Sequence, residues 1–157
     1  MIREIRQEDD APLSVVIRGA LEEFGANRPG TAYYDYSTDH LYEHFRAPRS
    51  VYFVAEADGV VQGGGGIYPS PGLPADTCEL MKMYLRPEAR GRGLGLALVR
   101  RCIEAARGLG YAQIYLESMP ELRQALALYE RLGWQYLDGP MGNTGHFGCD
   151  RWMLMKF

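Results

Sequence analysis

Paired cysteine, long apolar runs and widespread basic charge are all scarce in this sequence of 157 residues. Its three cysteines are odd in number and far apart, which argues against a disulfide framework and predicts reduced thiols. No apolar run approaches the roughly 18 residues of a membrane-spanning helix. The charged N-terminal residues 1–6 also lack the apolar stretch of a signal peptide. We therefore expect a cytoplasmic protein that does not enter a membrane.

Positive charge gathers in one place, at Arg90, Arg92, Arg100 and Arg101, and the formal net charge of the whole chain is −3. Neither feature favours nucleic acid as a main partner. The length and the apolar content of 46% are typical of a globular unit with a substantial core. We expect residues 1–157 to form a single domain, since no internal repeat or low-complexity segment divides them.

The segment from Cys78 to Gly95 carries the clearest pattern in the chain. Residues 78–85 alternate in a way that predicts a strand covered on both faces, and Pro87 ends it. The loop Arg90-Gly91-Arg92-Gly93-Leu94-Gly95 then leads into a helix, because apolar residues recur every three or four positions from Leu94 to Leu109. Glycines at a helix start leave free backbone N–H groups and the positive end of the helix dipole open to a phosphate. The loop therefore predicts an anion site.

The spacing within this loop discriminates among phosphate-binding motifs. A P-loop would need Gly-x-x-x-x-Gly-Lys followed by Ser or Thr, and no such run occurs. A dinucleotide fingerprint would need Gly-x-Gly-x-x-Gly, and residues 91–95 have the wrong phase. The loop does match Arg/Gln-x-x-Gly-x-Gly/Ala through Arg90, Gly93 and Gly95. In this it resembles the GNAT superfamily of N-acetyltransferases.

The resemblance extends over residues 51–134. Ala125 to Tyr129 is similar to the Ala-x-x-Leu-Tyr segment of that family, and Arg131 to Trp134 to its Gly-aromatic segment. Leu122 stands where the family often has asparagine, so the cofactor contact of that asparagine is not carried over. The resemblance implies an α/β (α+β) fold, a mixed, mostly antiparallel sheet flanked by helices, with acetyl-CoA as the cosubstrate.

By the same resemblance, acetyl-CoA binds this chain at two places. Main-chain groups of Met83, Tyr84 and Leu85 bind the acetyl carbonyl and the pantetheine where two parallel strands separate, and a backbone N–H there would stabilise the developing oxyanion. The pyrophosphate binds the loop and helix start formed by Arg90, Gly91, Arg92, Gly93, Leu94, Gly95 and Leu96.

The remaining patterns agree with a mixed sheet flanked by helices. They predict strands near residues 2–5, 51–57, 60–62, 111–116 and 151–157, and helices near residues 10–24, 41–45, 94–109 and 121–132. Asp58-Gly59 is a strong signal for a two-residue hairpin, and the run Gly63 to Gly66 predicts a bulge. The succession of strand, helix and strand over residues 78–116 predicts a parallel pair.

Acetyl transfer to an amine requires a base, because an ammonium group of pKa near 10.4 is protonated at neutral pH. Glu79 is our candidate. It precedes Met83 by four residues, so in a regular strand their side chains share a face. Burial between apolar neighbours makes a carboxylate a stronger base. An ordinary salt bridge is the alternative role of Glu79, and Glu117 is the second candidate base.

Tyr129 matches the family tyrosine that protonates the departing thiolate. A phenol of pKa about 10 is a reasonable proton donor to a thiolate whose conjugate acid has a pKa of about 8.5. Packing on the buried face of a helix is the alternative role of this side chain.

Glu117 is also a candidate for the acceptor site, together with four further residues. Tyr33 and Tyr34 lie in a region that walls this site in the family, with aromatic packing as the alternative. Asn143 and His146 belong to a glycine-rich loop, and loops at strand ends carry selectivity. Three histidines and three cysteines supply no second close pair of zinc ligands, so we expect no metal.

The sequence thus predicts an N-acetyltransferase that moves an acetyl group directly from acetyl-CoA to a primary amine of a small molecule, an amino acid or a peptide. A non-catalytic acyl-CoA-binding sensor and a nucleotide-binding protein that uses the same helix start are the alternatives. The acceptor is not identified by the sequence, which also leaves both a monomer and a homodimer open.

Overall fold

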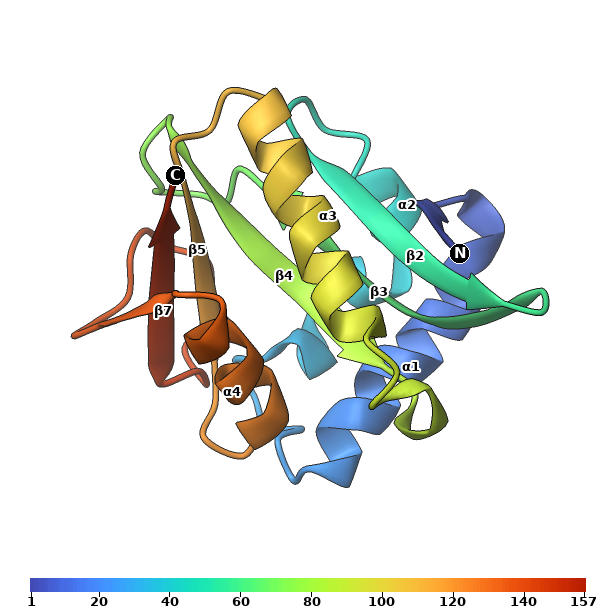
Figure 1. Ribbon diagram of the computed structural model, residues 1–157. Helices are drawn as coiled ribbons and strands as arrows, with labels where there is room; N and C mark the ends of the chain where they lie inside the picture. The colour runs from blue at the N-terminus through green and yellow to red at the C-terminus, as the bar shows by residue number, and fades with distance from the viewer.

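The computed structural model describes residues 1–157 and contains one seven-stranded sheet with the order β1-β2-β3-β4-β5-β7-β6 (Figure 1). The strands are β1 (Ile2–Glu4), β2 (Val51–Ala57), β3 (Val60–Tyr68), β4 (Thr77–Leu85), β5 (Gln113–Ser118), β6 (Gln135–Leu137) and β7 (Arg151–Lys156). Every neighbouring pair is antiparallel except β4 and β5, which are parallel. The predicted mixed, mostly antiparallel sheet is confirmed.

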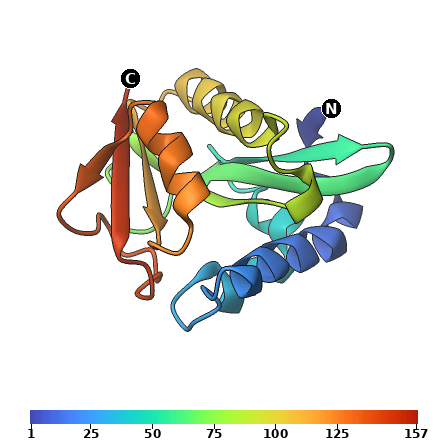
Figure 2. The same cartoon turned by 60° about the horizontal axis from the view of Figure 1, so that its bottom comes forward.

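Helices cover both faces of this sheet (Figure 2). They are α1 (Asp10–Glu23), α2 (Leu41–His44), α3 (Leu94–Gly108) and α4 (Arg123–Arg131), with 3₁₀ segments at Gln7–Asp9, Ala32–Tyr34, Tyr36–Asp39 and Pro87–Ala89. Two apolar cores result. The α3 core contains Leu98, Val99, Cys102, Leu126 and Tyr129, and the α1 core contains Leu13, Ile17, Leu21, Leu41 and Tyr52. None of the helices combines the length and the apolarity needed to cross a membrane.

The parallel pair of β4 and β5 is paired over a short stretch only. Residues 77–79 of β4 pair with residues 113–115 of β5, and the ladder between the two strands ends at Glu79 and Tyr115. Beyond that point β4 continues beside β3 and β5 continues beside β7. The middle of the sheet is therefore open between the carboxyl ends of these two strands.

Lys82 interrupts the alternation of β4. Its backbone is left-handed, with φ of +54°, and the register between β3 and β4 shifts around it. Cys78 and Leu80 belong to the α3 core, so Glu79 between them points to the α1 side. Met83 also packs against the α3 core. The expectation that Glu79 and Met83 share a face is therefore wrong, because a bulge at Lys82 turns the later part of the strand over.

The glycine run 63–66 lies inside β3. The register with β2 shifts just before Gly63, and the register with β4 shifts between Gly64 and Gly66, which confirms the predicted bulge. A Cβ atom on Gly64 would lie 2.5 Å from the ring of Tyr52, and one on Gly65 would lie 2.5 Å from the sulfur of Met83. The chain's own side chains thus require glycine there. The hairpin at 58–59 is confirmed as well, because both of its residues have the positive φ of a tight two-residue turn.

The sheet differs from the prediction at several places. The strand expected at residues 60–62 continues through the glycine run to Tyr68, because the glycines keep their pairing with β2 and β4. The strand expected at residues 111–116 runs from Gln113 to Ser118, because Tyr111 and Ala112 complete the turn after α3 through backbone hydrogen bonds to Ala106 and Asp76. The short strand β6, which pairs with β7, was not predicted. Three residues are too few for a periodic pattern.

Candidate active site

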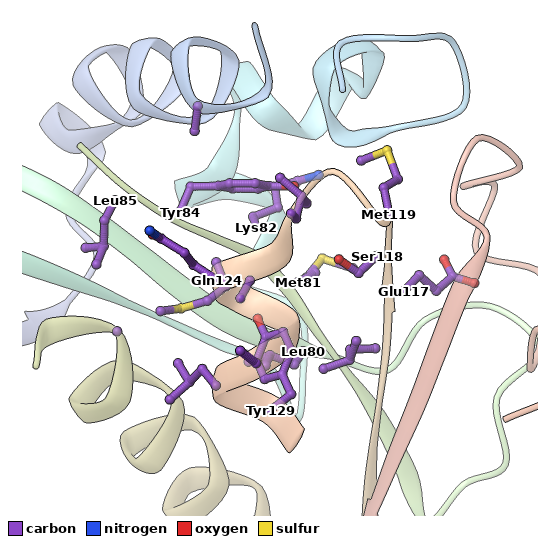
Figure 3. A pocket seen from close by; sticks show the side chains of 18 of the residues that line it. Leu80, Met81, Lys82, Tyr84, Leu85, Glu117, Ser118, Met119, Gln124 and Tyr129 are labelled. Carbon is purple, nitrogen blue, oxygen red and sulfur yellow. The ribbon is translucent and has the colours of Figure 1, made fainter. Parts of the chain in front are cut away.

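A cavity of about 990 Å³ lies where β4 and β5 separate (Figure 3). Its lining residues come from both faces of the sheet. Leu80, Met83, Leu116, Leu128 and Tyr129 are part of the α3 core or pack against it, and Ala32, Met81, Tyr84, Met119 and Leu122 do the same at the α1 core. The cavity therefore passes through the sheet and joins its two sides.

The start of α3 borders the cavity and has the geometry of an anion site. Gly93 is the N-cap residue with φ of +81°, and Gly91 has φ of +76°. A Cβ atom on either residue would meet nothing within 4 Å, so backbone conformation rather than crowding favours glycine. The first-turn amides of a helix have no partners within the helix, and its dipole favours an anion.

The predicted cofactor residues divide into two groups in the structure. Met83, Tyr84, Leu85, Arg90, Gly91, Gly93, Gly95 and Leu96 line the cavity, whereas Arg92 and Leu94 do not. Arg100 and Gln124 also line it and were missed. Arg100 carried a usable signal, because it follows Gly93 by seven residues and so lies two turns further along the same face of the helix.

Arg90 is held in place by the chain itself. Its guanidinium donates to the carboxylate of Glu23 at 2.7 Å and to the carbonyl oxygen of Leu85 at 3.0 Å, and it lies over the ring of Phe24. Arg90 therefore fastens the glycine-rich loop to α1 and to the end of β4.

Tyr129 lies on α4, on the α3 side of the sheet, where its ring packs beside that of Trp134. It lines the cavity, as Figure 3 shows. Burial raises the pKa of its phenol. The hydroxyl is therefore protonated throughout the physiological pH range.

Glu79 is the last residue of β4 that pairs with β5, so it lies beside the opening in the sheet. The residue is 1% exposed. The hydroxyl of Ser70 donates to its Oε1 atom at 2.6 Å. Its Oε2 atom lies 3.6 Å from Nδ1 of His146. Since the side chain points to the α1 side, Glu79 and Tyr129 approach the cavity from opposite faces.

Glu117 on β5 has more polar contacts than Glu79. The hydroxyl of Tyr115 donates to Oε2 at 2.7 Å, and the hydroxyl of Thr144 donates to Oε1. His146 adds a third contact, with Nδ1 3.2 Å from the same Oε1 atom. These partners hold the carboxylate in one orientation at the edge of the cavity.

His146 connects these carboxylates to a second group of charges. Its Nε2 atom lies 2.6 Å from Oδ2 of Asp35, and the ammonium of Lys82 donates to that same oxygen at 2.7 Å. Burial would lower the pKa of His146, but its carboxylate partners outweigh burial and raise its pKa to about 12. Burial would likewise raise the pKa of Asp35, but His146 and Lys82 lower it to about 2. At neutral pH these groups are an imidazolium and a carboxylate.

Sequence reasoning missed Lys82, Asp35 and Ser70. Lys82 carried a signal, because a lysine between two methionines in a covered strand must bury its charge and find a partner. Its side chain is 1% exposed, and its left-handed backbone costs about 1 to 3 kcal/mol. Asp35 and Ser70 lie in segments without a motif, and the fold alone brings them to the site.

Close backbone contacts fix the loop that carries His146, residues 139–150. A Cβ atom on Gly148 would lie 2.4 Å from the carbonyl oxygen of Pro29. At the other end, a Cβ atom on Gly72 would lie 2.8 Å from the backbone nitrogen of Asn143. Both ends of the loop are therefore pressed against neighbouring segments, and His146 is directed into the cavity between them.

The predicted acceptor-site residues also divide. Glu117 and His146 line the cavity, and Tyr33, Tyr34 and Asn143 do not. The hydroxyl of Tyr33 donates to Glu22, and its ring lies beside Arg18. Tyr34 and Asn143 are exposed.

Glu79, Glu117 and His146 also have the composition of a metal site, with one donor atom each within 4.8 Å of the others. A histidine must be neutral to bind a metal ion. A metal ion at this cluster would therefore compete with the ring protons of His146, whose two nitrogens face the carboxylates of Glu117 and Asp35.

Comparison with known proteins places the chain in a family. The model of the acetyltransferase (GNAT) family matches residues 17–134. The uncharacterized N-acetyltransferase YjgM of Escherichia coli is 39% identical over 157 residues, which cover 99% of this chain and 94% of that protein.

Solved structures agree at the level of the fold. An acetyltransferase of the GNAT family from Staphylococcus aureus superposes with a TM-score of 0.86 at 16% identity, over 99% of this chain and 98% of that one. The PaiA N-acetyltransferase of Thermoplasma acidophilum, solved in complex with coenzyme A, has a TM-score of 0.78 at 20% identity, over 100% and 98% of the two chains. The chain therefore belongs to the GNAT family and is an acetyl-CoA-dependent N-acetyltransferase.

Proposed function

We propose that this enzyme transfers an acetyl group directly from acetyl-CoA to the primary amine of a small molecule, an amino acid or a peptide. One observation carries the proposal. A single cavity passes through the sheet, with the start of α3 on one side and the carboxylate of Glu79 on the other. A donor and an acceptor can meet in such a cavity without a covalent enzyme intermediate.

The residues on the α3 side suit the donor. The amides at Gly93 to Leu96 would hold a diphosphate, and a backbone N–H in the segment Met83 to Leu85 would stabilise negative charge on the acetyl oxygen. Acetyl-CoA supplies the acetyl group as a thioester. Tyr129 lies on the same side of the sheet, and its phenol is protonated. It would give that proton to the leaving thiolate.

The residues on the α1 side suit the acceptor. Glu79 would take a proton from the ammonium of the acceptor, which frees the nitrogen lone pair to form the C–N bond as the C–S bond breaks. Ser70 holds the other carboxylate oxygen and fixes its direction. The acceptor nitrogen loses its second proton once the C–N bond has formed, and that proton replaces the one that Tyr129 gives to the thiolate. The products are the N-acetylated acceptor and the coenzyme A thiol, and the proton held by Glu79 passes to solvent.

Two measurements test the proposal. In a thermal-shift titration, coenzyme A at 100 times its dissociation constant should stabilise the protein by about 2.7 kcal/mol, and ATP should not. Thiol release from acetyl-CoA should then require an added primary amine.

The alternative functions give different results. A sensor would bind coenzyme A without releasing thiol in the presence of any amine, amino acid or peptide. A nucleotide-binding protein would be stabilised by ATP.

A further inference from the structure

We propose that the acceptor is an α-amino acid with an apolar side chain and that Lys82 binds its carboxylate. This inference rests on the proposed acetyl transfer at the same site. It concerns the part of the cavity on the α1 side, where Lys82 lies beside Tyr84 on β4 (Figure 3).

Lys82 has unused capacity to bind a ligand. Its side chain is 1% exposed and lines the cavity. An ammonium group has three N–H donors, and the structure pairs one of them, with Oδ2 of Asp35. Two donors remain for a bound molecule. Asp35, the one carboxylate that pairs with Lys82, is shared with His146, so an anionic group of a ligand would complete the pairing of this buried cation.

Positive and negative charges on the acceptor side gather at opposite ends. At one end, His146 and Lys82 both bind the same oxygen of Asp35, so two positive charges share one negative charge. At the other end, Glu79 and Glu117 both face Nδ1 of His146, so two negative charges share one positive charge. The acceptor side is therefore positive at Lys82 and negative at Glu79.

A zwitterion matches this arrangement. Its ammonium group would lie at Glu79, beside the opening to the donor side, and its carboxylate at Lys82. Lys82 is connected to Glu79 through Asp35 and His146 by contacts of 2.7, 2.6 and 3.6 Å. Both charged ends line the same cavity, and an α-amino acid carries both of the groups that would pair with them. A simple amine would leave the spare donors of Lys82 unpaired, and a peptide N-terminus would bring an uncharged amide to them.

The other walls of the acceptor side predict the rest of the substrate. They are mostly apolar, because Ala32, Met81, Met119, Leu122 and Cys149 line them, together with the ring of Tyr84. Burial raises the pKa of the Cys149 thiol to about 12, so this side chain is neutral as well. An apolar substrate side chain would be buried here without an unpaired polar group.

Acceptor pairs that differ only in the carboxylate test the proposal. We would measure kcat/KM by thiol release for leucine against 3-methylbutylamine, and for phenylalanine against phenethylamine. The wild-type enzyme should favour each amino acid. Lys82→Met, which keeps the length of the side chain and removes its charge, should reduce that preference about 10- to 100-fold, mainly through KM for the amino acid. Lys82→Arg should restore part of it.

Three results would overturn the inference. In the first, the wild-type enzyme prefers the amines, and in the second it leaves apolar amino acids unacetylated while it acetylates amines. Alternatively, Lys82→Met could lower kcat/KM equally for both members of each pair, which would make Lys82 a structural residue. The first two results leave the proposed acetyl transfer intact. Coenzyme A binding without thiol release from any acceptor would instead reject the proposed transfer itself.

Discussion

Glu79 and Tyr129 border one cavity from opposite faces of the sheet, with Glu79 pointing to the α1 side of β4 and Tyr129 on α4 at the α3 side. The bulge at Lys82 turns β4 over between Glu79 and Met83. Glu79 therefore faces the acceptor side, and Met83 faces the donor side. Under the proposed function the two side chains exchange protons with different atoms. Their substitutions should therefore have distinguishable effects.

Glu79→Gln should lower kcat about 10²- to 10⁴-fold at saturating acceptor, because an amide keeps the shape of the side chain but cannot take a proton. The pH dependence carried by this carboxyl group should disappear with it. Coenzyme A affinity, measured by titration, should stay within about twofold, since the donor side is untouched. An unchanged rate and pH profile would reject Glu79 as the base and direct the same experiment to Glu117.

Tyr129→Phe should lower kcat about 10- to 100-fold and leave coenzyme A affinity nearly unchanged, because it removes only the proton donor. Tyr111→Phe is a matched control. Its hydroxyl donates to the carbonyl oxygen of Arg49, away from the cavity, so its loss should affect stability and not turnover. Loss of coenzyme A binding without a loss of kcat would give Tyr129 a packing role.

Gly93→Ala should weaken coenzyme A binding, because φ of +81° costs a residue with Cβ roughly 1–2 kcal/mol and the helix start would shift to relieve it. Gly110→Ala is the matched control at the other end of α3, with φ of +87° and equally open space. Both variants should lose similar stability in urea unfolding. A titration should show weaker coenzyme A binding, by about tenfold, for Gly93→Ala alone.

His146→Gln should change how stability depends on pH. The folded-state pKa of about 12 exceeds the ordinary value of 6.5, so the stabilisation from the imidazolium is complete below pH 6.5 and is lost as pH rises toward 12. The wild-type free energy of unfolding should therefore fall above pH 6.5, by at most about 1.4 kcal/mol per pH unit for one proton. Urea unfolding between pH 6.5 and 9.5 should show a flatter profile for the variant. Equal slopes would contradict the ion pairs assigned to this ring.

Gly148→Ala should raise KM for the acceptor and spare coenzyme A affinity, because the new Cβ atom would lie 2.4 Å from the backbone of Pro29 and displace the loop that carries His146. A displacement of about 1 Å at such a site can cost up to about 100-fold in rate. Gly139→Ala in the same loop meets nothing within 4 Å and serves as the control. A matching rise in KM for both variants would show that loop flexibility, and not the contact with Pro29, matters.

The sequence predicted the sheet, the parallel pair and the helix after the glycine-rich loop because these depend on local periodicity and on a motif of fixed spacing. The sequence could not predict the bulge at Lys82, because no residue there favours a left-handed backbone. The register between β3 and β4 determines where the bulge forms. Glu79, Glu117 and His146 were named separately, and the fold brings them together. Asp35 was missed because its role depends on a contact with His146, 111 positions away.

The outer wall of the acceptor side comes from a different part of the chain than the rest of the cavity. Residues 79–132 build most of the donor side and the inner wall of the acceptor side. The outer wall comes from the segments around residues 28–35 and 139–150, which press against each other at Gly30 and Gly148. A change of substrate preference, by natural divergence or by grafting from a relative, must therefore involve both outer segments together. The donor-side residues that would bind acetyl-CoA need not change in such an exchange.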